Sequence, residues 1–285
     1  MDHVQWEEHP KLRRPVLLAA FEGWNDAADA ASTAARYLKE RWGARSFATI
    51  DPEEFFDFSS TRPHVRLTGG LQREIVWPRT ELSAAALPDT GRDVVVLLGS
   101  EPQLRWRTFS AQVVAVANEL GAELVVTLGA LLADVAHTRP VRVTGTAADP
   151  DLVARLGLER SAYEGPTGIV GVLHDAFRTA RLQSASLWAA VPHYVAATPS
   201  PKATLALVRR AASLLSTPVI TDDLEQRALD YERQVTEVVA TDEDVAAYVR
   251  RLEESADADN PLELQSGDVL AAELERFLRE QRGGE

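Results

Sequence analysis

Short apolar runs alternate along this chain with longer stretches whose apolar residues recur at helical spacing. This alternation constrains the fold most, because strand, helix and parallel strand in succession form the repeating unit of α/β proteins. Five apolar runs bounded by turn residues are predicted strands: 16–21, 46–50, 93–98, 123–128 and 185–191. We therefore predict an α/β fold in which a central, mainly parallel (mixed) sheet is flanked by helices.

Four stretches between or after these runs place apolar residues on one helical face. They predict helices with apolar faces over 27–42, 109–120, 169–180 and 205–215. Asn25 or Asp26 can cap the first helix, and Ser200 followed by Pro201 provides a cap and a first-turn proline for the last. The segment 65–76 is predicted to be a β-hairpin at a sheet edge.

Beyond Thr221 the strand pattern ends and only helical spacing remains. Apolar stripes predict helices over 224–238, over 245–252 behind a Thr241–Asp244 capping box, and over 270–277 behind Ser266, with a polar linker at 255–265. We assign residues 1–221 to an α/β core domain and residues 222–285 to an acidic helical C-terminal region. Its stripes either pack on the core or form a subunit contact, since exposed apolar stripes need a partner.

Charge is distributed unevenly along the 285 residues. The chain carries 43 acidic and 30 basic side chains, a net charge of −13, and residues 222–285 hold 19 of the acidic and 7 of the basic ones. This segment would repel a phosphate backbone, and the rest shows no clustered basic stripe, so we expect no nucleic-acid partner. The acidic segment is either a solvated helical surface or a site for a basic partner.

Missing residue types and motifs exclude several classes of protein. The chain has no cysteine, which excludes a disulfide scaffold, a thiolate nucleophile and cysteine-bound metals. The first ten residues are polar and acidic, and no apolar run approaches membrane-spanning length, so we expect a cytoplasmic protein without a membrane partner. H-E-x-x-H, G-x-S-x-G and P-loop motifs do not occur, so we expect no metal site, no hydrolase triad and no cofactor.

Ligands of open α/β sheets bind outside the carboxyl ends of parallel strands. The loops after the predicted strands and before the third predicted helix contain charged, histidine and aromatic residues. The candidate cleft or ligand-binding residues are Glu22, Trp24, Asp26, Glu101, Arg105, His137, Arg139, Thr167, His193 and Tyr194. Such residues can bind an anion or transfer protons, but they also serve as helix caps and structural ion pairs. The catalytic residues, if any exist, stay unknown at this point.

The segment 163–168 precedes the third predicted helix and is rich in glycine. Free backbone N–H groups at the start of that helix, together with the Thr167 hydroxyl, can seat an anion. Tight packing of the helix against a strand or a subunit explains the same glycines equally well.

Several distinctive strings occur in order along the chain. They are FEGWNDA at 21–27, DPEEF at 51–55, HTRP at 137–140, YEGPTG at 163–168 and WAAVPHY at 188–194. With them, the chain from about residue 15 to residue 252 resembles the proteasome assembly chaperone 2 family, in the branch found in high-GC Gram-positive bacteria. The resemblance implies a core similar to purine nucleoside phosphorylases, self-assembly as a homo-oligomer, specifically a trimer, and protein partners.

Two functions follow from these observations. The resemblance implies an assembly or protein-interaction role without demonstrated catalysis, and it assigns no catalytic residue. Eukaryotic chaperones of this kind dock on the proteasome through a C-terminal hydrophobic-Tyr-any tripeptide, whereas this sequence reads Gly283-Gly284-Glu285, so we do not expect that docking mode. The alternative is a small-molecule enzyme or binder that acts on an anionic substrate, a nucleoside with phosphate or a peptide-like carboxylate, in the predicted cleft.

Overall fold

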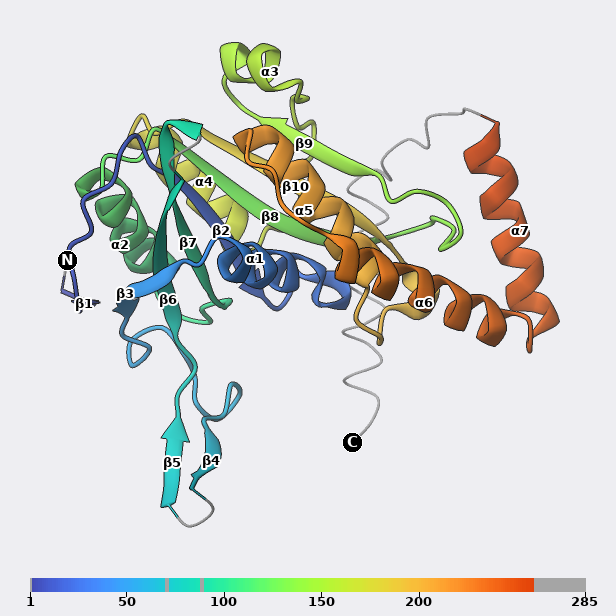
Figure 1. Cartoon of the computed structure of the whole chain (residues 1–285), viewed down its shortest axis with the longest axis horizontal. Helices are drawn as coiled ribbons and strands as arrows, with labels where there is room; N and C mark the ends of the chain where they lie inside the picture. The colour runs from blue at the N-terminus through green and yellow to red at the C-terminus, as the bar shows by residue number, and fades with distance from the viewer. Residues whose placement is uncertain (1, 70–71, 88–89, 259–285) are drawn as a thin grey trace.

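A computed structural model describes residues 2–69, 72–87 and 90–258 of the chain. In Figure 1 an eight-stranded mixed sheet, in the order β1-β3-β6-β7-β2-β8-β10-β9, lies between two layers of helices. Its strands are β1 (Val4–Trp6), β2 (Val16–Glu22), β3 (Arg45–Ile50), β6 (Thr80–Leu87), β7 (Arg92–Ser100), β8 (Leu124–Ala133), β9 (Val143–Ala147) and β10 (Ser184–Pro192). The four central strands β7, β2, β8 and β10 are mutually parallel, and the outer neighbours pair antiparallel.

Helices cover both faces of this sheet. They are α1 (Ala30–Arg41), α2 (Trp106–Glu119), α3 (Pro150–Leu156), α4 (Ile169–Thr179), α5 (Pro201–Leu215), α6 (Asp222–Val239) and α7 (Glu243–Asp257), with short 3₁₀ turns at Ala27–Asp29 and His193–Val195. Helices α1 and α5 pack on one face and α2 and α4 on the other. The predicted α/β fold with a mixed sheet between helices is therefore confirmed.

The central strand β2 shows why the sheet is buried on both sides. Its side chains alternate between two apolar cores, with Leu18 facing α1 and Leu17 and Phe21 facing α2 and α4. Phe109 of α2 packs edge-on against Phe21, with 5.9 Å between the ring centroids, and against Phe55 at 5.3 Å. Full burial of one such ring stabilises the fold by roughly 1.5–3 kcal/mol.

The hairpin does not lie at an edge of the main sheet, so that prediction was wrong. Strands β4 (His64–Thr68) and β5 (Gln72–Val76) form a separate two-stranded sheet. In Figure 1 it projects away from the rest of the molecule. Strand β6, which follows it, is inserted between β3 and β7, and its alanine-rich sequence carries little intrinsic strand signal.

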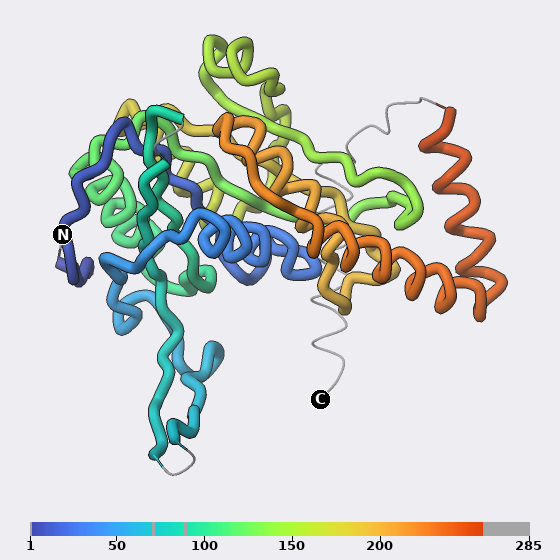
Figure 2. Tube along the Cα trace, in the orientation of Figure 1, coloured from blue at the N-terminus to red at the C-terminus, as the bar shows by residue number. Residues whose placement is uncertain are grey.

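The last helices are attached to the core over the loops that follow β8 and β10. Figure 2 shows α6 running past α5 before the chain turns into α7. Asp242, not Thr241, caps α7, because its carboxylate accepts the N–H groups of Asp244 and Val245, and the helix continues to Asp257 into the predicted linker. The predicted helix at 270–277 lies outside the described residues.

No helix among the described residues is long and apolar enough to cross a membrane. The division at residue 221 coincides with the start of α6 at Asp222. Whether residues 222–285 behave as a unit separate from the core stays a prediction, since α6 packs directly on α5.

Candidate functional site

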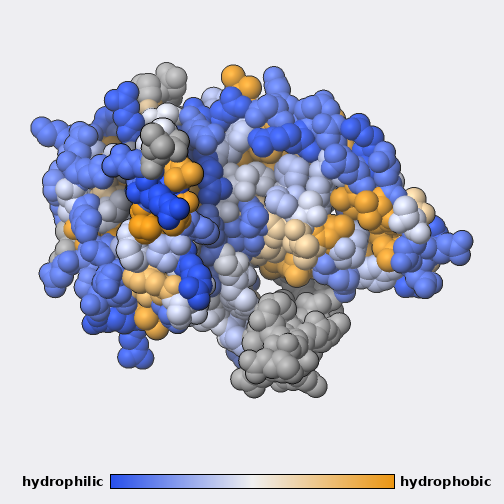
Figure 3. Space-filling view, turned by 90° about the horizontal axis from the view of Figure 1, so that it is seen from below, coloured by the Kyte–Doolittle hydropathy of each residue, from blue (hydrophilic) through white to orange (hydrophobic). Residues whose placement is uncertain are grey.

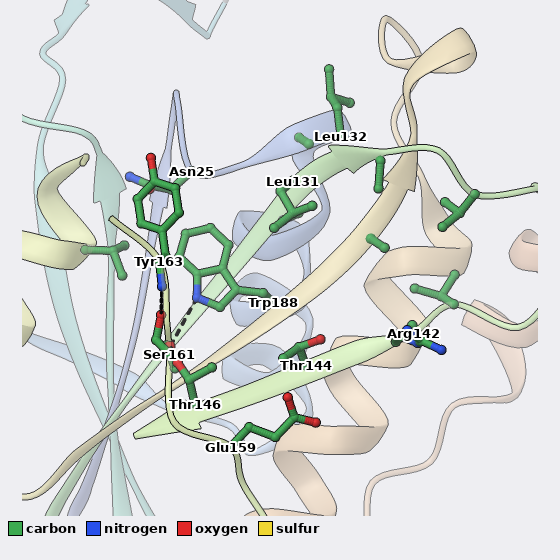
Figure 4. A pocket seen from close by; sticks show the side chains of 18 of the residues that line it. Asn25, Leu131, Leu132, Arg142, Thr144, Thr146, Glu159, Ser161, Tyr163 and Trp188 are labelled. Atoms are coloured by element: carbon green, nitrogen blue, oxygen red, sulfur yellow. Dashed lines mark hydrogen bonds between the residues drawn. The ribbon is translucent and has the colours of Figure 1, made fainter. Parts of the chain in front are cut away.

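A cleft of about 2200 Å³ lies over one face of the sheet, at the end where β8, β10 and β9 are neighbours (Figure 4). Alternate residues of β10 and β9 line it, because successive side chains of a strand point to opposite faces. The lining residues of these two strands are Ser184, Ser186, Trp188, Ala190, Pro192, Thr144, Thr146 and Ala147. The cleft therefore has a floor of hydroxyl groups and one indole ring.

The indole of Trp188 is fixed within this floor. Its Nε1 donates to Ser186 Oγ at 3.1 Å, and Ser186 Oγ lies 2.7 Å from Thr146 Oγ1 on the neighbouring strand. The ring lies over Gly129 of β8, where a Cβ atom would come within 2.5 Å of two ring carbons. Glycine at this position gives the indole the space to lie against the sheet.

His174 of α4 lies at one end of the cleft between two hydroxyl groups. Its Nε2 is 2.9 Å from Thr127 Oγ1 and its Nδ1 is 2.9 Å from Ser184 Oγ. Desolvation lowers the pKa of His174 to about 4. The imidazole is therefore neutral near pH 7, with one nitrogen donating and the other accepting.

The side chain of Glu101 binds at the N-terminus of α4. Glu101 Oε1 accepts the N–H of Ile169 at 2.7 Å and the amide of Asn25 at 3.0 Å. A Cβ atom at Gly168 would clash with both Asn25 and Glu101, so glycine permits this close approach. The predicted anion seat at residues 163–168 is thus filled from within the chain, because the loops after β2 and β7 meet at this helix N-terminus.

Asp26 is a buried helix cap. Its Oδ1 accepts the backbone N–H groups of Ala31 at 2.6 Å and Ser32 at 3.1 Å, and burial raises the pKa of this carboxyl group. Between cap and helix, Ala28 and Asp29 have φ values of 52° and 53°, which are strained for residues other than glycine. The capping bonds hold this tight turn at the mouth of the cleft, where Ala28 is exposed to it.

Two other predicted residues form surface ion pairs. Glu22 accepts from Arg36 at 2.8 Å and from Ser100 Oγ at 3.1 Å. Arg105 pairs with Glu54, which follows strand β3. The first pair joins the carboxyl end of β2 to α1, and the second joins the loop after β3 to the residue that precedes α2.

His137, in the loop after β8, is held by hydrogen bonds on both ring nitrogens. The Tyr194 hydroxyl accepts the backbone N–H of His137 at 2.8 Å and lies 2.8 Å from its Nδ1, while Nε2 lies 3.0 Å from Thr236 Oγ1. Because the Thr236 hydroxyl donates to the carbonyl of Glu232, it accepts from Nε2–H, and Tyr194 donates to Nδ1. Burial, followed by the charge of Lys202, lowers the pKa of His137, and burial raises that of Tyr194 to about 12.

His193 belongs to an aromatic cluster beneath α7. Its Nδ1 lies 3.1 Å from Asp134 Oδ1, which also accepts the hydroxyl of Tyr248 at 2.8 Å. The rings of His193, Tyr194 and Tyr248 meet edge-on, with centroids 5.5–6.2 Å apart. Burial raises the pKa of Tyr248. The cluster therefore joins the loops after β8 and β10 to the C-terminal helices.

Arg139 connects the same loop to the end of α7. Its Nε and Nη2 donate to the two carboxylate oxygens of Asp257 at 2.8 and 2.6 Å, and its Nη1 lies 3.4 Å from Glu253. This bidentate pairing holds the pKa of Asp257 below its usual range. The guanidinium group is thus engaged within the chain although it borders the cleft.

The structure divides the ten predicted residues into two sets. Trp24, His137, Arg139 and Thr167 border the cleft. The others serve the surrounding loops: Glu22, Asp26, Glu101, Arg105, His193 and Tyr194. No three His, Asp or Glu side chains gather in metal-binding geometry within the described ranges.

The hydroxyl-lined floor was missed by the sequence analysis. Its signal was the alternation in S-A-S-L-W at 184–188 and T-G-T at 144–146, which places polar residues on one face of each strand. That these two strands pair, so that Thr146 meets Ser186, is not visible in either string. The resulting arrangement favours binding of a ligand over proton transfer by histidine, because both imidazoles that line the cleft, His137 and His174, have their ring nitrogens bonded within the chain.

A sequence model of the PAC2 family matches residues 20–239 of this chain. The chain belongs to the PAC2 family. A crystal structure of a PAC2 family protein from Streptomyces avermitilis is 49% identical, with a TM-score of 0.78, and the match covers 82% of this chain and 99% of that one. The Mycobacterium tuberculosis proteasome-assembly chaperone homologue Rv2125 is 46% identical, with a TM-score of 0.75 and the same coverage.

The fold extends to distant proteins. PbaB of Pyrococcus furiosus, an archaeal proteasome activator, has a TM-score of 0.68 over 84% of this chain and 99% of its own, at 17% identity. This likeness shows the fold alone. None of the curated proteins compared with this PAC2 family chain matches it.

Proposed function

We propose that this PAC2 family protein is an oligomeric assembly or interaction protein that binds an extended segment of a partner protein in its cleft. The size of the cleft supports this most directly. At about 2200 Å³ it exceeds the 300–1,000 Å³ typical of small-molecule sites. Its floor offers hydroxyl groups and the Trp188 indole, which suit the peptide groups and apolar side chains of a protein segment.

The bonding of His137, Glu101 and Arg139 argues against catalysis by these residues and so supports binding. A general acid or base needs a hydrogen-bond position that faces the substrate. Both ring nitrogens of His137 form hydrogen bonds within the chain. The Glu101 carboxylate accepts the N–H at the start of α4, and Arg139 donates to Asp257. These groups stiffen the walls of the cleft.

The relatives support a protein as the partner. Rv2125, at 46% identity, is described as a proteasome-assembly chaperone homologue, so a proteasome subunit is the first partner to test for this chain. Self-assembly as a trimer and a cytoplasmic location, both implied by the sequence, complete the proposal.

Photo-crosslinking from the cleft tests this function. A photoreactive amino acid replaces Thr144, which lines the cleft, and the matched control replaces Asn118, an exposed polar residue of α2. After irradiation in host cells, position 144 should give a crosslink to one defined segment of a partner protein, identified by mass spectrometry. Position 118 should give none.

A blocking substitution provides the second measurement. Thr144→Trp should abolish capture of the crosslinked partner, and Asn118→Trp should leave it intact. The proposal fails if position 144 crosslinks nothing or if both tryptophan variants capture the partner equally. A thermal-shift screen with nucleosides and phosphate tests the small-molecule alternative, since a ligand at 100 times its Kd would stabilise the fold by about 2.7 kcal/mol.

A further inference from the structure

The β4–β5 hairpin is an arm that no strand or helix of the described residues covers. We define the arm as residues 64–69 and 72–77. Every residue of β4 is exposed, as are the first four of β5. An isolated two-stranded hairpin is marginally stable in water, so an arm of this kind gains stability when it packs against another surface.

One face of the arm is apolar. Val65 pairs with Ile75 and Leu67 with Arg73, so these four side chains point to the same side. Val65, Leu67 and Ile75 are 59%, 61% and 49% exposed, and Trp77 at the base is 48% exposed. A contiguous apolar face that is this accessible marks a contact site for another molecule.

The base of the arm is fixed, so the arm is held away from the core. The ring of Trp77 packs edge-on against Phe58, with 4.8 Å between centroids. Arg79 pairs with Glu81 at 3.2 Å on β6, which lies inside the main sheet. The arm therefore extends from a rigid strand, as Figure 1 shows.

Charge indicates which surface the arm fits. The arm carries two arginines, Arg66 and Arg73, and one glutamate, Glu74, and two more arginines, Arg62 and Arg79, flank it; residues 222–257 contain twelve acidic and four basic residues. Arg73, on the apolar face of the arm, forms no ion pair with the described residues. The cleft is less suitable for a basic arm, because arginines border it as well.

The helical pair α6–α7 also offers exposed apolar groups. Leu229 and Val238 both lie on α6. Leu229 is 62% exposed, and Val238, which is 66% exposed, lies on the opposite side of the helix beside the turn into α7. In Figure 1 this pair lies toward the opposite end of the long axis from the arm. Figure 3, which views the molecule from below, shows hydrophobic residues at both places among hydrophilic ones. An arm therefore reaches this surface only on another molecule.

We propose that the apolar face of the arm docks on the α6–α7 pair of a second copy of this chain. The apolar side chains of the arm cover Val238 beside the α6–α7 turn, while Arg73 on the same face of the arm meets carboxylates of the helices. The two surfaces differ, so the copies join head to tail, an arrangement that forms a ring when the rotation closes. This inference uses surfaces outside the cleft and concerns only the self-assembly element of the proposed function.

Mass measurement of purified full-length protein tests the role of the arm. Multi-angle light scattering after gel filtration should give a multiple of 31.2 kDa for the wild type. Leu67→Glu with Ile75→Glu should reduce the mass to that of one chain. The control, Thr68→Glu with Gln72→Glu, adds the same charge to the opposite face of the same hairpin and should keep the wild-type mass. Circular dichroism checks that all three proteins melt alike.

Disulfide trapping tests the partner surface. The natural chain has no cysteine, so a Leu67→Cys copy mixed with a Val238→Cys copy can form only newly introduced bonds. We expect a mixed disulfide between the two, and at least tenfold less with Thr68→Cys in place of Leu67→Cys. Arg73→Glu should weaken self-association at least tenfold, more at low salt than at high salt.

Several results would overturn the inference. They are a monomeric wild type, a Leu67→Glu/Ile75→Glu variant of unchanged mass, or trapping of Leu67→Cys only with itself. A monomeric wild type that binds anionic phospholipid vesicles through Leu67 and Ile75 would identify a membrane as the occupant instead. None of these results affects crosslinking from position 144, so self-assembly through the arm and partner binding in the cleft fail separately.

Discussion

The imidazole of His174 makes the stability of this protein depend on pH, and the single substitution His174→Gln separates this contribution from the others. Its pKa is lowered from 6.5 to about 4 in the folded chain, whereas in the unfolded chain it takes up a proton near pH 6.5. The unfolded state therefore binds more protons between these values. Stability is fully present above pH 6.5 and is lost as the pH falls toward 4.

The magnitude follows from the two pKa values. At about 1.4 kcal/mol per pKa unit, their difference corresponds to about 3 kcal/mol in the free energy of unfolding. About 2 kcal/mol of this should be lost between pH 7 and pH 5. The physical reason for the loss is the burial of the ring, which disfavours its charged form. Protonation also removes the acceptor nitrogen that faces Thr127 or Ser184.

Urea unfolding at pH 7, 6 and 5, followed by tryptophan fluorescence, measures this effect. His174→Gln keeps a donor and an acceptor for the two hydroxyl groups but does not titrate, so its stability should fall about 2 kcal/mol less than that of the wild type over this range. His64→Gln, on the exposed β4 strand, is the matched control and should follow the wild-type profile. His137, which also has a lowered pKa, contributes to all three proteins alike. Identical profiles for His174→Gln and the wild type would refute the reasoning.

Three further substitutions test single contacts. Gly129→Ala brings a methyl group within about 2.5 Å of the Trp188 ring, so thermal melts should show a loss of about 1–3 kcal/mol that Trp188→Leu in the same chain relieves. Tyr194→Phe leaves a buried N–H without its acceptor, and calorimetry should show a loss of about 1–3 kcal/mol. Arg139→Met should speed amide exchange in α7, whereas Arg178→Met, whose partner lies within α4, should not; equal exchange in both variants would contradict the bridging role.

The strands and most helices could be predicted because their signals are local. The β2 sequence VLLAAFE is apolar throughout, which requires burial on both faces, and Ser200 with Pro201 begins α5 by bonds within one turn. Strand β6 gave no such signal. Its alanines are held in the sheet by the strands on either side, β3 and β7, rather than by their own preference.

The candidate site was predicted in part for the same reason. Loops after parallel strands share one edge of the sheet, so Trp24, His137 and Arg139 were expected near a common hollow, and all three border the cleft. The hydrogen-bond partners of these residues could not be predicted from the sequence, since Arg139 and Asp257 are 118 residues apart. The filling of the α4 N-terminus by Glu101 depends likewise on contacts 68 residues apart.

The sequence alone determined the alternation of strands and helices, the acidic character of residues 222–285 and the resemblance that placed the chain in its family. Only the tertiary structure decided which polar groups remain available at the cleft and that the β4–β5 arm stands apart from the sheet. The physical reason is the sequence distance over which each interaction acts. Periodicity and capping act within a few residues, whereas hydrogen-bond partners, desolvation and the exposure of an apolar face depend on segments that only folding brings together.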